Sequence, residues 1–277
     1  MIVAREIAAV RSWRALQEGA VGLVPTMGYL HEGHLSLLER ARRENASLAA
    51  SLFVNPAQFG PKEDLSNYPR DFERDRRLLA DAGCDLLFCP EPSQMYPDGF
   101  ETWVDLGSIA APLEGERRPG HFRGVATVVL KLLHIVEPSR AYFGEKDAQQ
   151  LAVIRRMARD LDLRVDIVAC PTVREGSGLA VSSRNSYLSP AEHAAAAVLY
   201  RALSAARDLW RGGERDATRL REAMRMVLAQ EPLARPDYVS VADLATLQEL
   251  DTVRGPALLS LAVFVGKARL IDNFRLE

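Results

Sequence analysis

The sequence has few cysteines, no long apolar run and no excess of charge of one sign. Its three cysteines, Cys84, Cys89 and Cys170, include no Cys-x-x-Cys pair, which favours reduced core thiols over metal ligands or disulfides. The formal charge of −2 and the pI near 6.3 provide no electrostatic footprint for nucleic acid or an anionic membrane. The apolar stretch at residues 257–266 is too short to span a bilayer. We therefore expect neither a nucleic-acid nor a membrane partner.

The amino-terminal residues indicate where the protein is located, and the length and composition indicate how many domains it has. Residues 1–6, Met-Ile-Val-Ala-Arg-Glu, place charges where a signal peptide needs its apolar stretch, so we expect a cytoplasmic protein. With 277 residues, 48% hydrophobic and 26% charged, the chain has the composition of a globular protein and exceeds the usual size of one compact domain. One large domain and one smaller domain are expected.

Apolar runs alternate with amphipathic stretches through roughly the first 170 residues, which is the pattern of a parallel sheet wrapped by helices. The expected strands are residues 20–25, 48–54, 85–89, 140–143 and 164–170. The expected helices are residues 34–44, 70–82, 124–136 and 148–161. This pattern predicts an α/β fold, a Rossmann-like doubly wound parallel sheet over residues 1–172. Ligands of such sheets bind at the carboxyl ends of the strands, so the loops after Pro25, Val54, Phe143 and Cys170 should converge.

The character of the chain changes after Ser189-Pro190. An alanine-rich helix is expected at residues 191–211, followed by Gly212-Gly213 and a second helix at residues 217–230. Short apolar strands are expected at residues 237–242 and 257–265. Residues 173–277 are therefore predicted to form a small C-terminal α+β domain with its own core.

Residues 25–34, Pro-Thr-Met-Gly-Tyr-Leu-His-Glu-Gly-His, lie where an expected strand gives way to a helix. His31 and His34 are three apart, which puts both imidazoles on one side of the first helical turn. The N–H groups of that turn and its positive dipole end form an anion site, and Gly28 and Gly33 let a phosphate approach the backbone. Two histidines at a helix start are also typical of caps or surface residues. A zinc site is the weaker alternative, because no third ligand lies nearby.

A second candidate is the string Gly144-Glu145-Lys146-Asp147, followed by Gln149 and Gln150, at another expected strand-to-helix junction. A lysine reaches phosphates as a mobile point charge, and a carboxylate can hold ribose hydroxyls. Alone, the string also fits a solvated turn. Its place at the expected ligand edge favours a nucleotide site.

A third candidate is residues 181–185, Val-Ser-Ser-Arg-Asn, which follow the glycine-bearing residues 174–178. Two hydroxyls, their backbone N–H groups and a guanidinium suit a triphosphate. Viewed alone, this segment is better explained as a polar loop between domains.

A fourth candidate is residues 53–60, where a strand ends with two amides beside aromatic rings. Gln58 offers a donor and an acceptor to a hydroxyl or carboxylate, and Phe53 and Phe59 offer apolar wall. Asn-Pro is otherwise only a turn signal. The basic run at residues 117–122 fits a solvated turn at least as well as an anion loop.

Taken in order, these segments resemble the pantothenate synthetase family, within the nucleotidyltransferase-like superfamily of α/β proteins that carry His-x-Gly-His. The matching segments are residues 25–37, 53–59, 68–70, 118–125, 144–151 and 182–185. His-x-Gly-His alone indicates only the superfamily. Six ordered segments across nearly the whole chain indicate the family.

The resemblance implies an activity. Pantoate and β-alanine would be condensed with ATP, through a pantoyl-adenylate, to give pantothenate, AMP and diphosphate, with Mg²⁺ and a homodimeric enzyme. His34 would be the catalytic acid and His31 its phosphate-binding companion, with Lys146 and Arg184 supplying further charge.

The resemblance also implies the binding residues. Those of the ATP site would be Met27, Gly28, Tyr29, Leu30, His31, Glu32, Gly33, His34, Gly144, Glu145, Lys146, Asp147, Val173, Val181, Ser182, Ser183 and Arg184. Gln58 and Gln150 would hold pantoate, Gln58 would also border β-alanine, and Asp75 is a candidate for an outer contact to magnesium. The family usually has Met where this chain has Val181, and an acidic residue near Ser177. These departures concern the packing of one loop rather than the reaction.

Two rivals stand beside this interpretation. A nucleotidyltransferase or an aminoacyl-tRNA-synthetase-like enzyme shares the His-x-Gly-His chemistry, but a tRNA partner requires a basic surface that this composition does not indicate. A non-catalytic nucleotide-binding module would not require His31, His34, Lys146 and Arg184 together. The fold alone does not separate these alternatives.

Overall fold

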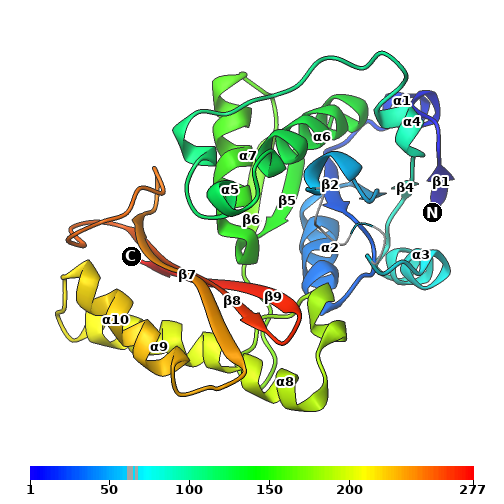
Figure 1. Cartoon of the computed structure of the whole chain (residues 1–277). Helices are drawn as coiled ribbons and strands as arrows, with labels where there is room; N and C mark the ends of the chain where they lie inside the picture. Colours follow the sequence, from blue (N-terminus) through cyan, green and yellow to red (C-terminus); the bar gives the residue numbers. More distant parts are fainter. Residues whose placement is uncertain (61–64, 66–67) are drawn as a thin grey trace. The chain divides into compact units, whose positions relative to one another are not determined.

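The computed structural model describes residues 1–60, 65 and 68–277, and these divide into two compact units (Figure 1). The first unit comprises Met1–Ala110, Glu114–Glu145 and Gln150–Pro171. The second comprises Ala111–Leu113, Lys146–Gln149 and Thr172–Glu277. Two short segments from the first two-thirds of the chain thus belong to the second unit, which the sequence pattern did not indicate.

A six-stranded parallel sheet with the order β1-β4-β3-β2-β5-β6 forms the centre of the first unit (Figure 1). The strands are β1 (Ile2–Ala4), β2 (Val21–Thr26), β3 (Ser47–Leu52), β4 (Leu86–Phe88), β5 (Arg140–Gly144) and β6 (Asp166–Cys170). From β2 the chain moves outward through β3 and β4, and later through β5 and β6 on the other side. The strand order therefore reverses between β2 and β5, where doubly wound sheets bind their ligands. The predicted α/β fold class is confirmed.

Helices and short 3-10 turns connect these strands. They are α1 (Ile7–Ala15), α2 (Glu32–Glu44), η1 (Pro56–Gln58), α3 (Phe72–Asp81), α4 (Pro92–Met95), η3 (Ser108–Ala110), α5 (Glu114–Arg117), α6 (His121–Val136), η4 (Glu145–Asp147) and α7 (Ala148–Asp160). The helix expected at residues 34–44 begins earlier, at Glu32, because His31 takes the N-cap position. The helix expected at residues 124–136 likewise begins earlier, at His121.

The core of the first unit joins helix α2 to the sheet. Leu37 and Leu38 lie four and three positions before Ala41, on the side of α2 that Ala41 also occupies, and all three pack in one cluster with Val24 and Leu48 of the strands. Each fully buried leucine contributes roughly 1.5–3 kcal/mol relative to an exposed one. This packing fixes α2, and with it the histidine motif at the start of the helix.

The three cysteines are free and buried. Burial raises the pKa of the Cys84 thiol to about 12, and it also raises the pKa values of Cys89 and Cys170. A raised pKa leaves little of the reactive thiolate at neutral pH, so these thiols act as small core side chains.

The second unit has its own antiparallel sheet in the order β7-β8-β9 (Figure 1). Its main elements are η5 (Ser183–Tyr187), α8 (Pro190–Ala196), α9 (Val198–Arg211), α10 (Ala217–Leu228), β7 (Ala234–Asp243), β8 (Ala257–Val265) and β9 (Ala268–Leu276). The single helix expected at residues 191–211 is two helices that meet at Ala197. A core of apolar side chains from α9, α10 and the sheet is separate from that of the first unit. None of the helices among the described residues has the length and apolar character needed to cross a bilayer.

Helix α6 approaches the turn η1 so closely at Gly124 that no side chain fits. A Cβ atom at Gly124 would lie 2.2 Å from the carbonyl oxygen of Ala57 and 2.7 Å from the backbone nitrogen of Gln58. Both atoms are backbone and cannot swing aside. In addition, the Gly124 carbonyl accepts a hydrogen bond from Asn55 Nδ2 at 3.2 Å. The absence of a side chain at residue 124 thus fixes η1 against α6.

We predict that Gly124→Ala lowers the free energy of unfolding by roughly 1–3 kcal/mol, because an added methyl group must push two backbone segments apart. Urea denaturation measures this change. Gly107→Ala is the control, because a Cβ atom there meets nothing within 4 Å, and its effect should stay within about 0.5 kcal/mol. An unfolding midpoint of Gly124→Ala equal to that of the wild type would mean that α6 and η1 do not make this contact.

Candidate functional site

The loop between β2 and α2 is held by one buried carboxylate. Asp75, in the first turn of α3, is 1% exposed. Its Oδ2 accepts the backbone N–H of Tyr29 at 2.7 Å, and its Oδ1 accepts that of Leu30 at 2.8 Å. Gly28 and Tyr29 both have left-handed backbones, with φ of 91° and 52°. The carboxylate therefore pairs two backbone donors that this sharp turn removes from regular secondary structure.

These bonds give Asp75 a structural role that the sequence did not indicate. Both carboxylate oxygens are engaged by backbone N–H groups, so the burial of Asp75 is explained without a metal ion. Among residues 1–60, 65 and 68–277, no group of three or more His, Cys, Asp or Glu side chains could hold a metal ion. The donor set thus does not form a protein cage for Mg²⁺, an ion that is usually bound through substrate phosphates and one or two carboxylates. An outer contact from Asp75 to magnesium stays a prediction.

The imidazoles of His31 and His34 lie against each other at the start of α2. Their ring centroids are 4.0 Å apart, with an angle of 35° between the planes. The backbone N–H of His31 donates to Nδ1 of His34 at 3.3 Å. Since Nδ1 accepts, the proton of the neutral His34 ring is assigned to Nε2, which is then a hydrogen-bond donor. The two histidines cap the helix, and the same arrangement orients a donor on His34.

Gly33 makes room for this pair. A Cβ atom at Gly33 would lie 3.0 Å from Nδ1 and from Cε1 of His31. A side chain at this position would require the His31 ring to shift by a few tenths of an ångström. The glycine of the His-x-Gly-His motif thus leaves room for the packing of the rings, in addition to the phosphate approach expected from the sequence.

A buried amide cluster at the end of β3 orients Gln58. Asn55, which is 1% exposed, donates from Nδ2 to Oε1 of Gln58 at 3.0 Å and accepts the hydroxyl of Tyr96 at 2.8 Å. Burial raises the pKa of Tyr96 to about 12, so this hydroxyl stays protonated and donates. Gln58 Nε2 lies 3.0 Å from Sδ of Met27. The structure therefore brings Gln58 beside the first residue of the predicted ATP-binding segment.

Arg118 and His121 lie close to the backbone of Gln58, although the sequence left their role open. His121 Nδ1 is 2.9 Å from the carbonyl oxygen of Gln58, and Arg118 Nη1 is 3.1 Å from His121 Nε2. His121 is 9% exposed and begins α6, whereas Arg117, Pro119 and Gly120 are exposed. The solvated turn thus holds for the first part of this run and not for His121. Asn55 is one of the two amides noted in residues 53–60, but its role in orienting Gln58 was not predicted. Tyr96 was missed, because no local pattern marks it.

A cavity of about 410 Å³ opens in the first unit at the carboxyl ends of β2, β3 and β4. Its lining includes Met27, Gly28, Phe53, Phe72 and Asp75. Phe53, which was predicted to form an apolar wall, thus lines the same cavity as Met27 and Gly28 at the start of the histidine motif. Gln150 lies half-buried in the first turn of α7.

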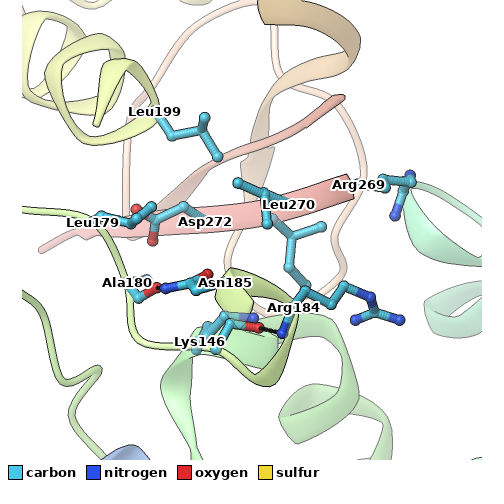
Figure 2. A pocket seen from close by; sticks show the side chains of 11 residues that line it. Lys146, Leu179, Ala180, Arg184, Asn185, Leu199, Arg269, Leu270 and Asp272 are labelled. Atoms are coloured by element: carbon cyan, nitrogen blue, oxygen red, sulfur yellow. Dashed lines mark hydrogen bonds between the residues drawn. The ribbon is translucent and has the colours of Figure 1, made fainter. Parts of the chain in front are cut away.

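The second unit gathers further predicted residues around a narrow pocket (Figure 2). Lys146 of η4 lines this pocket together with Ser182 and Arg184, which belong to the segment predicted to bind triphosphate. Ser182 Oγ accepts the backbone N–H of Arg184 at 3.3 Å, and Asn185 Nδ2 donates to the carbonyl oxygen of Ala180 at 3.1 Å (Figure 2). A lysine and an arginine from distant parts of the sequence therefore share one pocket.

The loop before this segment folds back on itself. The backbone N–H of Val181 donates to the carbonyl oxygen of Val173 at 3.0 Å, which brings two predicted ATP-binding residues together. Gly178 has a φ of 88°, and a Cβ atom there would lie 2.3 Å from the ring of Tyr200. Ser177 Oγ accepts the N–H of Leu179 at 3.3 Å, so the residue that departs from the family pattern closes the turn.

Comparisons with known proteins agree along the whole chain. A family profile described as "Pantoate-beta-alanine ligase" matches residues 2–275. The chain is 61% identical to the pantothenate synthetase of Roseiflexus castenholzii over 277 residues, which cover 100% of both chains. Its structure is similar to that of pantothenate synthetase from Thermus thermophilus, with a TM-score of 0.95, 52% identity and 99% of each chain covered. It is also similar to a pantoate-beta-alanine ligase from Francisella tularensis, solved in complex with "Beta-gamma ATP and Beta-alanine", with a TM-score of 0.81, 37% identity and coverage of 99% and 97%.

We predict that Asp75→Asn loosens the loop after β2, because an amide has one acceptor oxygen and cannot pair both backbone N–H groups. Leaving one buried donor unpaired costs roughly 1–3 kcal/mol. Hydrogen exchange at the amides of Tyr29 and Leu30 should therefore become faster, as measured by NMR.

Asp81→Asn is the matched control, since Asp81 lies exposed at the last position of the same helix. It should leave exchange at these two amides unchanged. If Asp75→Asn leaves the exchange rates alone and instead raises the magnesium concentration needed for activity, Asp75 is a metal contact rather than the support of this loop.

Proposed function

This chain belongs to the pantoate–β-alanine ligase family, and on that premise we propose that it condenses pantoate with β-alanine, using ATP and releasing AMP and diphosphate. The observation that carries the proposal is the match along residues 2–275, which includes every motif that bears charge or an amide. The relative solved with an ATP compound and β-alanine supports the same two ligands here. The match therefore makes another enzyme of the superfamily, or a non-catalytic binding module, the weaker alternative.

The reaction needs two balanced steps, because a carboxylate is a poor acyl donor. In the first, a carboxylate oxygen of pantoate attacks the α-phosphorus of ATP, the bond to the bridging oxygen breaks, and diphosphate leaves with the electron pair. In the second, the amine nitrogen of β-alanine attacks the acyl carbon of the mixed anhydride. AMP then leaves with the electrons of the broken C–O bond, and the new amide nitrogen loses a proton. The protein mainly aligns these groups and stabilises charge on phosphate oxygens.

His34 is proposed as the principal donor to the reacting phosphate. Its Nδ1 accepts from the backbone of His31, which directs the neutral ring to donate from Nε2. His31 is proposed to bind phosphate beside it, since the two rings are in contact. Lys146 and Arg184, which line one pocket, are proposed to bind further phosphate oxygens.

Gln58 is proposed to hold pantoate and to border β-alanine, together with Gln150 for pantoate. The bond from Asn55 fixes the amide orientation of Gln58 and leaves its NH₂ group against Met27 Sδ. Sulfur is a weak acceptor, so a hydroxyl or carboxylate oxygen of a substrate would take its place favourably. Asn55 and Tyr96 would then act through Gln58 rather than on the substrate itself.

Magnesium and a second copy of the chain belong to the same proposal. Mg²⁺ is expected to arrive on the phosphates of ATP and would neutralise charge there when bound. The homodimer rests on the resemblance to the family alone. The proposed lid role of residues 173–277 rests on the chemistry, because an acyl-adenylate exposed to water would hydrolyse.

The sharpest test of the proposed function is exchange of labelled diphosphate into ATP without any amine. We predict that pantoate and magnesium together support this exchange, because the first step is reversible and does not involve the nucleophile. Addition of β-alanine should then give pantothenate and AMP in equal amounts. Exchange driven by an amino acid in place of pantoate would favour the aminoacyl-tRNA-synthetase-like rival, and nucleotide binding without exchange would favour the binding module.

The His34→Ala variant serves as the internal test of the site within this assay. Loss of one preorganised donor to developing charge should lower the exchange rate by about 10²–10³. His134→Ala is the matched control, because His134 lies exposed on α6. Wild-type exchange by a folded His34→Ala variant would remove this residue from the mechanism.

We predict that Gln58→Ala and Gln150→Ala raise the KM for pantoate about tenfold or more while leaving ATP binding nearly unchanged, since a hydrogen bond lost at a desolvated site costs roughly 1–3 kcal/mol. Initial rates with each substrate varied in turn measure the difference. Gln149→Ala is a useful comparison, because Gln149 Nε2 donates to the carbonyl oxygen of Pro112 and has a structural partner. Equal weakening of ATP and pantoate would mean that the two amides are wrongly assigned to pantoate.

A further inference from the structure

Two consecutive polar side chains interrupt the burial pattern of β9. Along this strand, exposure alternates from Ala268 to Ile271, but Asp272 and Asn273 are both buried, at 3% and 7% exposure. A strand with one face in a core normally buries every second residue, and buried polar groups need partners. Both side chains find partners in the segments that carry the proposed nucleotide-binding residues of this unit.

Asn273 holds the backbone of Lys146. Its Nδ2 donates to the carbonyl oxygen of Lys146 at 2.9 Å. Lys146 lies in η4, a turn of three residues, and such short 3-10 turns have few internal hydrogen bonds to stabilise them. A buried bond from a β-strand therefore adds a rigid support directly at the residue that carries the ammonium group.

Asp272 holds the loop that leads to Ser182 and Arg184. Its carboxylate forms a bidentate pair with Arg174, with distances of 2.7 Å and 2.9 Å. Arg174 also donates to the carbonyl oxygen of Gly178 at 3.0 Å, across the loop. Its guanidinium lies 5.1 Å from the ring centre of Tyr200, which further restricts it. The neighbouring positions 272 and 273 thus contact the two segments that carry Lys146, Ser182 and Arg184, which line one pocket.

We propose that Asn273 is a positioning residue for ATP use, acting through Lys146, and that β9 is the rigid base for both phosphate-binding segments of the second unit. The inference rests on the proposed role of Lys146 in ATP binding. A lysine side chain has four rotatable bonds, so its ammonium group is placed well only when its backbone is fixed. Asn273 itself touches neither substrate nor reacting atoms in this assignment.

The test compares Asn273→Asp and Asn273→Leu with the wild type in diphosphate exchange, with ATP varied at saturating pantoate. Both changes remove the donor. Asp keeps nearly the same side-chain volume and the polar character, whereas Leu keeps the branched shape but is larger and apolar. We expect kcat/KM for ATP to fall about tenfold, the effect of one lost hydrogen bond. The KM for pantoate should stay within about twofold of the wild type.

Ser260→Ala is the matched control. Ser260 is the cross-strand neighbour of Asn273 on β8 and is 5% exposed, and its Oγ has no hydrogen-bond partner within the described part of the chain. This control measures how a small substitution at a buried position of the same sheet affects the kinetics when the hydrogen bond to Lys146 is kept. Its kinetics should match the wild type.

A double-mutant cycle with Lys146→Ala separates positioning from general damage to the fold. If Asn273 acts through Lys146, Asn273→Asp should change kcat/KM for ATP by no more than about twofold in the Lys146→Ala background. The same tenfold fall in both backgrounds, or no fall in either, would overturn the inference. Wild-type ATP kinetics of Lys146→Ala itself would instead reject the proposed role of Lys146, and the positioning role would fall with it.

Discussion

The histidine motif depends on the two hydrogen bonds between the carboxylate of Asp75 and the backbone of residues 29 and 30. The turn after β2 requires left-handed backbones at Gly28 and Tyr29, and it leaves two adjacent N–H groups pointing to one side. One carboxylate has one oxygen for each of them. Because His31 follows directly after Leu30, this pairing sets the residue at which α2 begins. The contact between the two imidazoles, and the donor on His34, follow from that starting point.

Each unit holds its proposed ligand-binding residues in place through buried polar contacts, to a side chain in the first unit and to the backbone in the second. In the first unit, Gly124 lets α6 approach η1, and the amide of Asn55 then orients Gln58. In the second, Asn273 binds the carbonyl oxygen of Lys146 and leaves its ammonium group to other partners. This is a sensible arrangement for charge stabilisation, because donors held in place before the reaction need no reorganisation when charge develops.

The sequence predicts the fold well where the pattern is long and periodic. The five expected strands of the parallel sheet are present because each is an apolar run between clear turn signals. The three-residue strand β1 was missed, since a segment of this length carries no period that could be recognised. The helix expected at residues 191–211 is divided at Ala197, where alanine propensity alone gives no reason for a break. Of the candidate site, sequence motifs indicated Gln58, His31, His34, Lys146 and Arg184, but not the residues that orient them.

The residues that the sequence does not reveal share a physical property. Tyr96 and Asn273 are polar side chains whose partners lie far away along the chain, so no local spacing marks them. Asn55 binds its neighbour Gln58, but its contacts with Tyr96 and Gly124 are also distant in sequence. Strand β9 was missed for a different reason, because Asp272 and Asn273 break the alternation by which a strand is recognised. Sequence-based rules are expected to fail at functional sites, where the local sequence departs from the regular pattern of its secondary structure. A missed strand that buries two adjacent polar residues is therefore itself an indication of function. In this chain one of these residues, Asn273, donates a hydrogen bond to the backbone of Lys146.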